Sequence, residues 1–228
     1  MEFLMNNELH KNVSIRKYIP IGILSYLCIH MLTKAEITTQ FIIDTVAPVF
    51  NKFGYAGTSM SDITKATGLT KGAVYGNFEN KEQLALEVFN FSVRRVIWKV
   101  SDRVKEQDSA TDKLKAITRF YRQYYEMVID FGGCPLLNVG VDTNNTMPVL
   151  HAQVLSVLKK LQNNIKAIFD LGIANGEFKP DLESKRLSAR FVSQIQGAVF
   201  TSVMLKNHDH LIDMTDFIDH EIDATYSN

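Results

Sequence analysis

The residues best suited to chemistry in this sequence lie between Thr58 and Lys81. This segment reads TSMSDITKATGLTKGAVYGNFENK and brings lysines, hydroxyl residues, glycines and a tyrosine into one short stretch. Lysines and helix N-termini bind phosphate, while hydroxyl, amide and aromatic groups can contact base edges. The chemistry that this mixture indicates is recognition of duplex DNA.

Two short helices would present these groups. Lys71 places a cation at the start of the second helix, Tyr75 offers a ring to thymine methyls and a hydroxyl to phosphate, and Lys81 can reach a flanking phosphate. The lysines could instead be solvated surface charges and Tyr75 a core aromatic, whereas Phe78 is predicted to be core. The predicted DNA contacts are Thr58, Ser59, Lys71, Gly72, Tyr75, Gly76, Asn77 and Lys81.

Catalytic and metal-binding patterns are weak by comparison. No Ser/His/Asp order, phosphate-cradling glycine loop or carboxylate pair stands out, so we expect no enzyme and no cofactor. Cys28 and Cys134 are far apart and form no metal pattern, which favours reduced thiols. Cys134 could be a redox sensor, but no basic neighbour lowers its pKa. His208-Asp209-His210 is interpreted as a solvated turn and not a metal site.

Local signals predict how the short helices begin and end. Ser59 and Asp62 have the spacing of a capping box, so one helix should start there and stop at Gly68, after about Thr67. Thr70 can cap a second helix that reaches about Phe78. Helices this short are not stable alone. They must be held by a shared core, predicted to consist of Ile63, Leu69, Val74 and Phe78, which is the arrangement of a helix-turn-helix.

Longer helices should flank this unit. A helix from about Lys34 to Phe53 has a kink or break predicted near residues 44–47, because Pro48 removes one intrahelical bond. Its expected buried stripe is Ile37, Phe41, Val46, Val49, Phe50 and Phe53. Asn80 with Gln83 should cap another long helix, which carries Leu84, Val88, Phe91, Arg95 and Trp98.

Helical periodicity continues to the C-terminus. Amphipathic stretches cover residues 112–131, the region after Pro148, the region after Pro180, and residues 211–226, with an irregular link expected over 132–145. No strand-type alternation is visible. The sequence therefore predicts an all-α fold with a helix-turn-helix DNA-binding domain over 33–81 and a helical ligand-binding and dimerisation domain over 82–228.

Charge gives DNA binding only modest support. The 228-residue chain has a formal net charge of zero, so no whole-molecule field attracts nucleic acid. Between Met31 and Val100 there are eight Lys or Arg and six Asp or Glu residues, a balance of +2. Binding would depend on a local surface and on specific contacts.

Residues 1–32 form a separate leader. Arg16-Lys17 precede an apolar run from Tyr18 to Leu32, which is too short to span a membrane and is followed by no clear cleavage site. We interpret the leader as an upstream extension before a natural start near Met31; a packed arm and an export signal are alternatives. A cytoplasmic protein that does not insert into a membrane is expected.

The segment that carries the DNA chemistry resembles the N-terminal signature of the TetR family of bacterial regulators. The matching residues are Phe50, Gly54, Thr58 to Ile63, Gly68, Lys71-Gly72, Tyr75, Phe78 and Lys81, and the segments Gly133–Asn138 and Gly176–Pro180 resemble one branch of the family. The resemblance implies a homodimeric repressor of a double-stranded DNA operator. It further implies dimerisation through about 182–207 and 211–226, and release by a small-molecule effector.

The effector pocket is the least defined prediction. Aromatic, methionine and amide side chains could line a pocket for a largely apolar compound, or they could be ordinary core. The pocket candidates are Trp98, Tyr121, Tyr124, Tyr125, Met127, Phe169, Phe191 and Gln194. The alternative function is a helical small-molecule-binding protein without a specific DNA target, and an enzyme is a more distant one.

Overall fold

A computed structural model describes residues 33–228, and the predicted leader with Cys28 lies outside this range. The described chain folds into successive helices, and its one β-type pairing is an isolated bridge between Phe178 and Ser227. The all-α prediction is therefore confirmed. None of the helices in residues 33–228 is long and apolar enough to cross a membrane.

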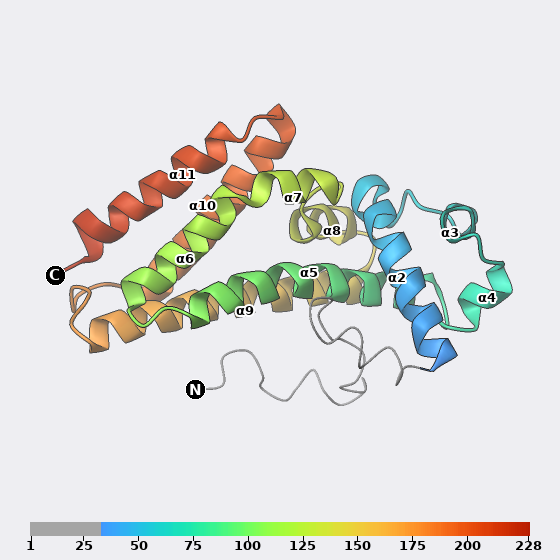
Figure 1. The fold of residues 1–228 in the computed structure, drawn as a ribbon, viewed down its shortest axis with the longest axis horizontal. Coiled ribbons are helices and arrows are strands. Elements are labelled where there is room, and N and C mark those ends of the chain that lie inside the picture. Colours follow the sequence, from blue (N-terminus) through green and yellow to red (C-terminus); the bar gives the residue numbers. More distant parts are fainter. Residues whose placement is uncertain (1–32) are drawn as a thin grey trace.

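Three helices form one end of the elongated molecule: α2 (Lys34–Phe53), α3 (Met60–Thr67) and α4 (Lys71–Tyr75) (Figure 1). Helix α2 begins with a capping box in which Thr33 and Glu36 bond to each other's backbone nitrogens. It ends at Gly54, whose φ of 75° is in the region that favours glycine.

Helix α5 (Lys81–Lys105) leads from this end into the rest of the chain and runs beside the long helix α9 (Pro148–Ala174) (Figure 1). Helices α6 (Ala110–Arg122), α7 (Tyr124–Asp130) and α8 (Pro135–Thr143) connect them. Helices α10 (Ser184–Leu205) and α11 (Asp209–Glu221) pack against each other, and a π-helical turn, η3 (Ile222–Tyr226), completes the chain.

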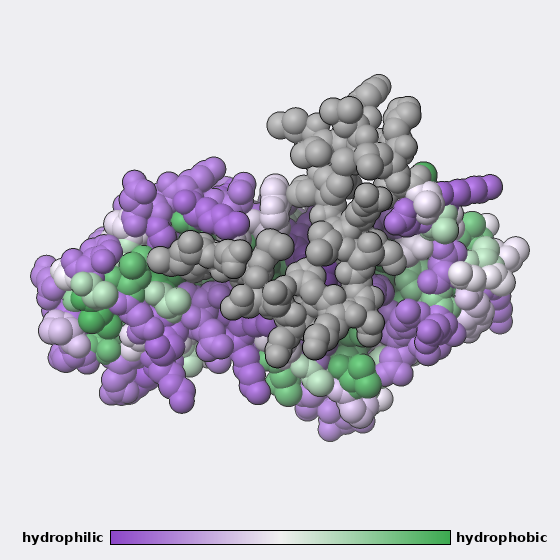
Figure 2. Space-filling view, turned by 90° about the horizontal axis from the view of Figure 1, so that it is seen from below, coloured by the Kyte–Doolittle hydropathy of each residue, from purple (hydrophilic) through white to green (hydrophobic). Residues whose placement is uncertain are grey.

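One continuous hydrophobic core joins these parts. Ile42, Val46 and Phe50 of α2 pack with Leu84 and Val88 of α5, and the same core continues through the helices that follow. The surface seen in Figure 2 is mainly hydrophilic with separate hydrophobic patches, as expected when most apolar side chains are buried. Because α5 contributes to both ends of the core, helices α2 to α4 are firmly attached to the C-terminal helices.

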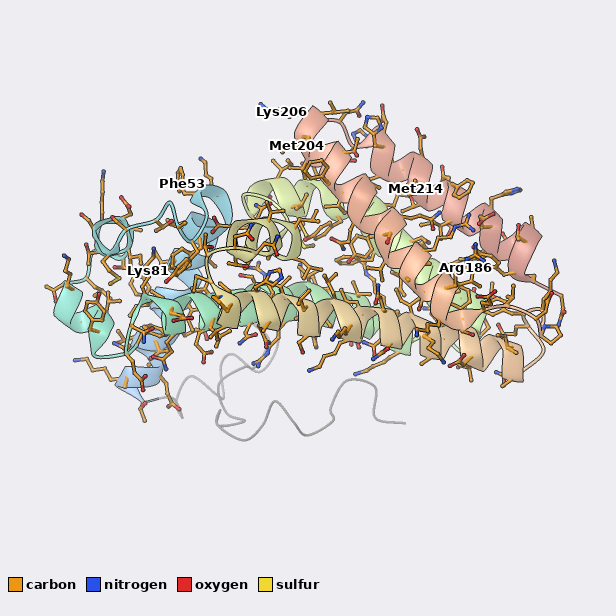
Figure 3. The ribbon with its side chains drawn as sticks, turned by 180° about the vertical axis from the view of Figure 1, so that it is seen from behind. Phe53, Lys81, Arg186, Met204, Lys206 and Met214 are labelled. Carbon is orange, nitrogen blue, oxygen red and sulfur yellow. The ribbon has the colours of Figure 1, made fainter. Side chains whose placement is uncertain are left out.

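Helix α2 corrects two predictions. It is continuous through Pro48, so the expected break near residues 44–47 is wrong. Pro48 removes only the bond to the Asp44 carbonyl, and both residues are exposed, so water can satisfy that carbonyl. The predicted buried stripe is also rotated: Ile37, Phe41 and Phe53 are exposed, whereas Ile42, Ile43 and Ala47 are buried. Figure 3 shows Phe53 at the outer side of the end of α2.

The region after residue 108 differs from prediction in two places. The helix expected over 112–131 is divided at Gln123, whose φ of −101° and ψ of 3° end α6 and begin α7. The link expected over 132–145 contains helix α8, which starts with Pro135 at its first turn. Proline favours that position because its φ is already helical and its missing N–H would have no partner there.

Close packing fixes the far end of the molecule. Gly172 of α9 lies so close to the ring of Phe178 that a Cβ atom would overlap it. The Glu177 carboxylate accepts hydrogen bonds from the backbone nitrogens of Ala110 and Thr111 at 2.9 and 3.0 Å, which caps α6. The packing of Gly172 against Phe178 and the cap on α6 therefore fix the positions of the helices at this end.

Candidate DNA-binding surface and effector cavity

The helix-turn-helix has the local geometry that the sequence predicts. Ser59 and Asp62 form the capping box of α3: the backbone nitrogen of Ser59 donates to the Asp62 carboxylate at 2.8 Å, and that of Asp62 donates to the Ser59 hydroxyl at 3.2 Å. Gly68 ends α3 in the left-handed conformation with φ of 68°. The Thr70 hydroxyl then caps α4 by accepting from the Ala73 nitrogen.

A small core holds the two helices together. Ile63, Val74 and Phe78 are almost fully buried, and Leu69 is half-buried, as predicted. Helix α4 ends at Tyr75, three residues earlier than expected, and Phe78 reaches the core from the turn that follows. The turn after α4 is therefore part of the hydrophobic support of this unit.

The outer side of α4 is open to solvent. Lys71, Gly72, Tyr75 and Gly76 are exposed, and the side chain of Tyr75 remains 46% exposed although it is aromatic. Nothing within the described chain covers this ring, so its exposure has no explanation in packing. These four predicted contact residues share a surface that is accessible to a large partner.

Thr58 and Asn77, two of the predicted DNA contacts, have their side chains engaged inside the protein. Thr58 is buried, and its hydroxyl donates to the Gly54 carbonyl at 2.7 Å, so this side chain is not exposed for the predicted DNA contact. The Asn77 amide accepts from Thr39 and donates to the Ala73 carbonyl, both at 2.8 Å. Asn77 thus attaches α4 to α2, a tertiary role that its position in the sequence does not indicate.

Ser59 and Lys81 are also engaged. The Ser59 hydroxyl is exposed but donates to Asp62 at 2.6 Å within the capping box. The Lys81 ammonium donates to the Tyr55 carbonyl at 2.6 Å and lies 4.1 Å from the centre of the Tyr55 ring (Figure 3). Partial burial lowers the pKa of Lys81. The Lys81 side chain therefore contacts Tyr55 in the loop before α3.

Polar contacts connect the end of α2 to the segment that begins α8. The buried Asn51 amide donates to the carbonyls of Phe131 and Gly133, and Asn138 donates to the Asn51 carbonyl at 2.8 Å. In α8, the Asp142 carboxylate accepts from the backbone nitrogens of Tyr55 and Ala56 at 2.6 and 3.2 Å. The residues that precede the DNA-binding helices are thereby fixed to the C-terminal helices.

A cavity lies among helices α5 to α10. It is partly open to solvent, with about 910 Å³ of space between its walls when the open part is included, and every residue that lines it is uncharged. Its wall comprises Val93, Val96, Ile97, Val100, Ser101 and Val104 of α5; Ile117, Tyr121 and Tyr124; Cys134, Pro135 and Leu136; Val157, Leu161, Asn164, Ile165 and Ile168 of α9; and Phe191, Val192, Ile195 and Gln196 of α10. This composition suits a mainly apolar small molecule.

The polar groups of the wall form a short chain. The Tyr124 hydroxyl bonds to the Cys134 thiol, and the Cys134 sulfur lies 3.9 Å from the Gln196 amide oxygen. Burial raises the pKa of the Tyr124 and Cys134 side chains, so both stay protonated at neutral pH. A buried, protonated thiol is a poor nucleophile, which weakens the redox interpretation of Cys134.

Three of the eight predicted pocket residues, Tyr121, Tyr124 and Phe191, line this cavity. The other five predicted pocket residues do not line it. Trp98 is half exposed on α5, Gln194 is on the same helix as Gln196 but outside the wall, and Phe169 packs with Phe178 and Tyr226. Tyr125 lies beside His208, and Met127 beside the Lys99 ammonium.

The wall residues that sequence reasoning missed are mostly aliphatic. Val93, Ile97, Val100 and Val104 recur at helical spacing on α5, and this stripe was the available signal. A buried stripe has the same pattern whether it meets another helix or a cavity, so the pattern alone does not identify a pocket. Asn164 and Ser101 were missed because isolated polar residues in a helix are common.

Helices α10 and α11 carry exposed apolar side chains. Phe200 and Met204 are 54% and 60% exposed on α10, and Phe217 of α11 is 45% exposed. Figure 3 shows Met204 near the outer end of α10 and Met214 on α11. Large exposed apolar groups on adjacent helices are typical of a surface that meets another protein.

In residues 33–228, no cluster of His, Cys, Asp or Glu could hold a metal ion, and His210 lies in the first turn of α11 instead of in a loop.

Comparison with known proteins agrees with this architecture. Residues 42–88 match the family model of bacterial regulatory proteins of the tetR family, and residues 110–218 match that of the tetracyclin repressor-like C-terminal domain. A TetR transcriptional regulator from Chloroflexus aurantiacus is 31% identical, with a TM-score of 0.82 over 86% of this chain and 99% of that one. A TetR-family regulator from Cytophaga hutchinsonii is 32% identical, with a TM-score of 0.78 over 86% and 98%.

A curated relative has a similar extent. The HTH-type transcriptional repressor DhaR of Mycobacterium sp. (strain GP1) is 23% identical over 175 residues, which cover 75% of this chain and 85% of that protein. The chain belongs to the TetR family of bacterial transcriptional regulators. It is a DNA-binding transcriptional regulator with an N-terminal helix-turn-helix and a helical C-terminal domain.

Proposed function

We propose that this protein is a repressor that is released from its operator by a small, largely apolar molecule bound in the cavity among α5 to α10. The observation that carries the proposal is that the cavity wall is bonded to helices α2 to α4, which we call the reading head. Cys134, Pro135 and Leu136 line the cavity, and the flanking Gly133 and Asn138 bond to Asn51 at the end of α2. We place the protein in the cytoplasm and assign it no enzymatic activity.

The exposed side of α4 is the proposed reading surface, with the domain boundary near residues 81 and 82. Lys71 and the first backbone nitrogens of α4 would contact phosphate, and Tyr75 would meet bases or sugar. Gly72 and Gly76 allow the backbone to approach the groove closely. Thr58, Asn77 and Lys81 would support this surface from behind through the contacts that they make within the domain.

Movement would pass from the cavity through α8. A molecule that displaces Pro135 or Leu136 also displaces Asn138 and Asp142, which bond to Asn51, Tyr55 and Ala56. The Tyr55 loop leads directly into the capped start of α3. A ligand that prefers the displaced arrangement would therefore lower DNA affinity by shifting the population toward it.

Dimerisation is proposed through α10 and α11, within about 182–207 and 211–226. Phe200, Met204 and Phe217 provide the exposed apolar surface that such a contact would bury. Two reading heads on one dimer would then enter successive major grooves. A dimer also compensates for the modest positive charge of each head, because its phosphate contacts add.

Gel-shift assays with the DNA that adjoins the gene test this function. The full chain should retard a specific fragment, and Lys71→Ala combined with Tyr75→Ala should weaken binding of the dimer by about a thousandfold or more, because two contacts worth about 1–2 kcal/mol each are lost from each protomer. Lys159→Ala, which removes an exposed lysine from α9, is the matched control and should bind as the original does. Removing one lysine–phosphate contact from each protomer should also reduce the salt dependence of the dimer by about two counterions.

Two outcomes would contradict the proposal. Unchanged binding by the Lys71 and Tyr75 double variant would mean that another surface reads DNA. Failure to retard any genomic fragment at low salt, together with tight binding of a small molecule, would favour the alternative of a small-molecule-binding protein without a DNA target.

A further inference from the structure

We propose that the cavity selects an uncharged molecule, largely apolar, whose hydrogen-bonding group meets the hydroxyl of Ser101. This inference rests on the proposed effector role of the cavity and adds the chemical class of the effector. Two features of the wall carry it: the lack of any charged side chain and one buried hydroxyl without a partner.

The absence of charged side chains from the wall disfavours ionic ligands. No lysine, arginine, histidine, aspartate or glutamate lines the cavity. Two cations on α5 that adjoin wall residues in the sequence contact other groups: the Lys99 ammonium lies 3.9 Å from the Met127 sulfur, and the Arg103 guanidinium lies 5.1 Å from the centre of the Phe120 ring. A carboxylate, phosphate or ammonium that entered would lose water without gaining a counter-charge.

Ser101 provides the polar contact. Its side chain is 6% exposed and lines the cavity, and its hydroxyl oxygen has no hydrogen-bond partner in the described chain. Serine hydroxyls in helices commonly bond to a carbonyl one turn earlier, as Ser92 of the same helix does with Val88 at 2.8 Å. Ser101 is therefore a buried donor and acceptor that a ligand can satisfy.

The other polar groups of the wall are less available. Tyr124, Cys134 and Gln196 are already linked to one another. Tyr121 and half-buried Asn164 also line the wall, but neither has a polar atom that is fully buried without a partner, as the Ser101 hydroxyl is. A ligand with several polar groups would have to break the existing chain. One hydroxyl, carbonyl or non-basic aryl N–H group on an apolar body fits the wall better, because it satisfies Ser101 and leaves the Tyr124–Cys134–Gln196 contacts intact.

A pair of fluorescent probes that share one ring system tests the charge requirement. N-phenyl-1-naphthylamine is neutral with one N–H, and 8-anilino-1-naphthalenesulfonate adds a sulfonate to the same rings. Titration of the full chain should show the neutral probe binding at one site per protomer, at least about tenfold more tightly than the anionic probe. Equal or tighter binding of the sulfonate would overturn the proposal.

Two variants on α9 locate the site. Asn164→Lys places a cation in the wall and should raise the affinity for the sulfonate by about tenfold, the effect of one partly buried charge contact. Asn163→Lys adds the same charge to an exposed position outside the wall and should leave both affinities unchanged. An equal response of the two variants would show that the probes bind elsewhere and would overturn the assignment.

Ser101→Ala tests the hydrogen bond. It should weaken binding of the neutral probe by about threefold to tenfold, the effect of one hydrogen bond, with no change in the thermal unfolding temperature that would indicate general damage. Ser92→Ala on the same helix removes a buried hydroxyl outside the wall and should leave probe affinity unchanged. Unchanged affinity in Ser101→Ala would overturn the role of this residue.

The same preparations distinguish this inference from the proposed function. Gel shifts without neutral-probe binding would overturn the ligand class while the DNA-binding role stands. Neutral-probe binding with the expected variant effects, but no retardation of DNA, would support the ligand class and overturn the repressor function.

Discussion

The carboxylate of Asp142 in α8 accepts a hydrogen bond from the backbone nitrogen of Tyr55, 2.6 Å away, in the loop between α2 and α3. The same oxygen accepts from Ala56 at 3.2 Å. Lys81 holds the other side of this loop by donating to the Tyr55 carbonyl at 2.6 Å. The loop that enters the DNA-binding helices is thus held between one acidic and one basic side chain from different parts of the chain.

Asp142→Ala should therefore weaken the junction. Two backbone donors lose a charged acceptor, and hydrogen bonds to charged groups are worth about 1.5–3 kcal/mol each before water replaces them. We expect the free energy of unfolding to fall by about 1–3 kcal/mol, measured by urea denaturation.

The matched control is Asp130→Ala, which removes an exposed carboxylate from the end of α7. It should change stability by less than about 0.5 kcal/mol, as surface substitutions generally do. Equal effects of the two substitutions would show that Asp142 contributes only general surface charge.

The helix-turn-helix was the most predictable part of the fold because its signals are local. The Ser59–Asp62 capping box, Gly68 and the Thr70 and Asn80 caps each act within a few residues, and each appears in the structure where the sequence places it. Ile63 of α3, Val74 of α4 and Phe78 of the turn after α4 form the small core, which was predictable because these apolar residues lie close together along the chain on either side of the Gly68 turn.

The roles of Asn77, Lys81 and Thr58 could not be predicted from spacing. Asn77 and Lys81 bond to partners chosen by tertiary packing, Thr39 and the Tyr55 carbonyl. Thr58 bonds locally to the Gly54 carbonyl, but its burial depends on the surrounding helices. The cavity shows the same limit, because the α5 stripe through Val100 does not reveal whether it faces a helix or a space. Long-range contacts decide these positions, and one sequence carries little information about them.

Gly172→Ala should be strongly unfavourable. The new Cβ would overlap the Phe178 ring and press on Ala110, both of which are fully buried, so neither can move into solvent. We expect a loss of about 1–3 kcal/mol, typical of overpacking, in urea denaturation.

Gly197→Ala on α10 is the matched control for the chemical change. A Cβ there has no neighbouring atom within 4 Å, so the substitution should gain up to about 1 kcal/mol through helix propensity. Because Gly197 lies within the proposed dimer region, the comparison uses a monomeric background such as Phe200→Glu, and destabilisation by Gly197→Ala there would contradict this packing analysis.

Phe200→Glu should disrupt the proposed dimer. Phe200 is 54% exposed on α10, and a carboxylate at the centre of an apolar contact would have to be desolvated without a counter-charge. We expect a change from dimer to monomer at micromolar concentration, measured by sedimentation velocity. Trp98→Glu, which replaces a 50% exposed aromatic on α5 with the same charge, should leave the dimer intact. A dimer that survives Phe200→Glu would place the contact on another surface.

Tyr226 should make the free energy of unfolding fall with rising pH in the alkaline range. Burial, followed by its hydrogen bond to the Glu221 carboxylate at 2.9 Å, raises the pKa of Tyr226 to about 12. In the unfolded chain this hydroxyl titrates near its ordinary value of about 10, so its contribution is fully present below pH 10 and is lost as the pH rises toward 12.

Tyr226→Phe should be less stable than the original by about 1 kcal/mol near pH 9, because the hydrogen bond to Glu221 is removed. The difference should shrink and close near pH 11, since only the original has an unfolded state stabilised by ionisation of this residue. The contributions of the other tyrosines and the lysines are the same in both proteins and cancel when the two are compared. The measurement is urea denaturation of both proteins at pH 9 and pH 11. A difference that stays constant over this range would mean that Tyr226 titrates alike in the folded and unfolded states.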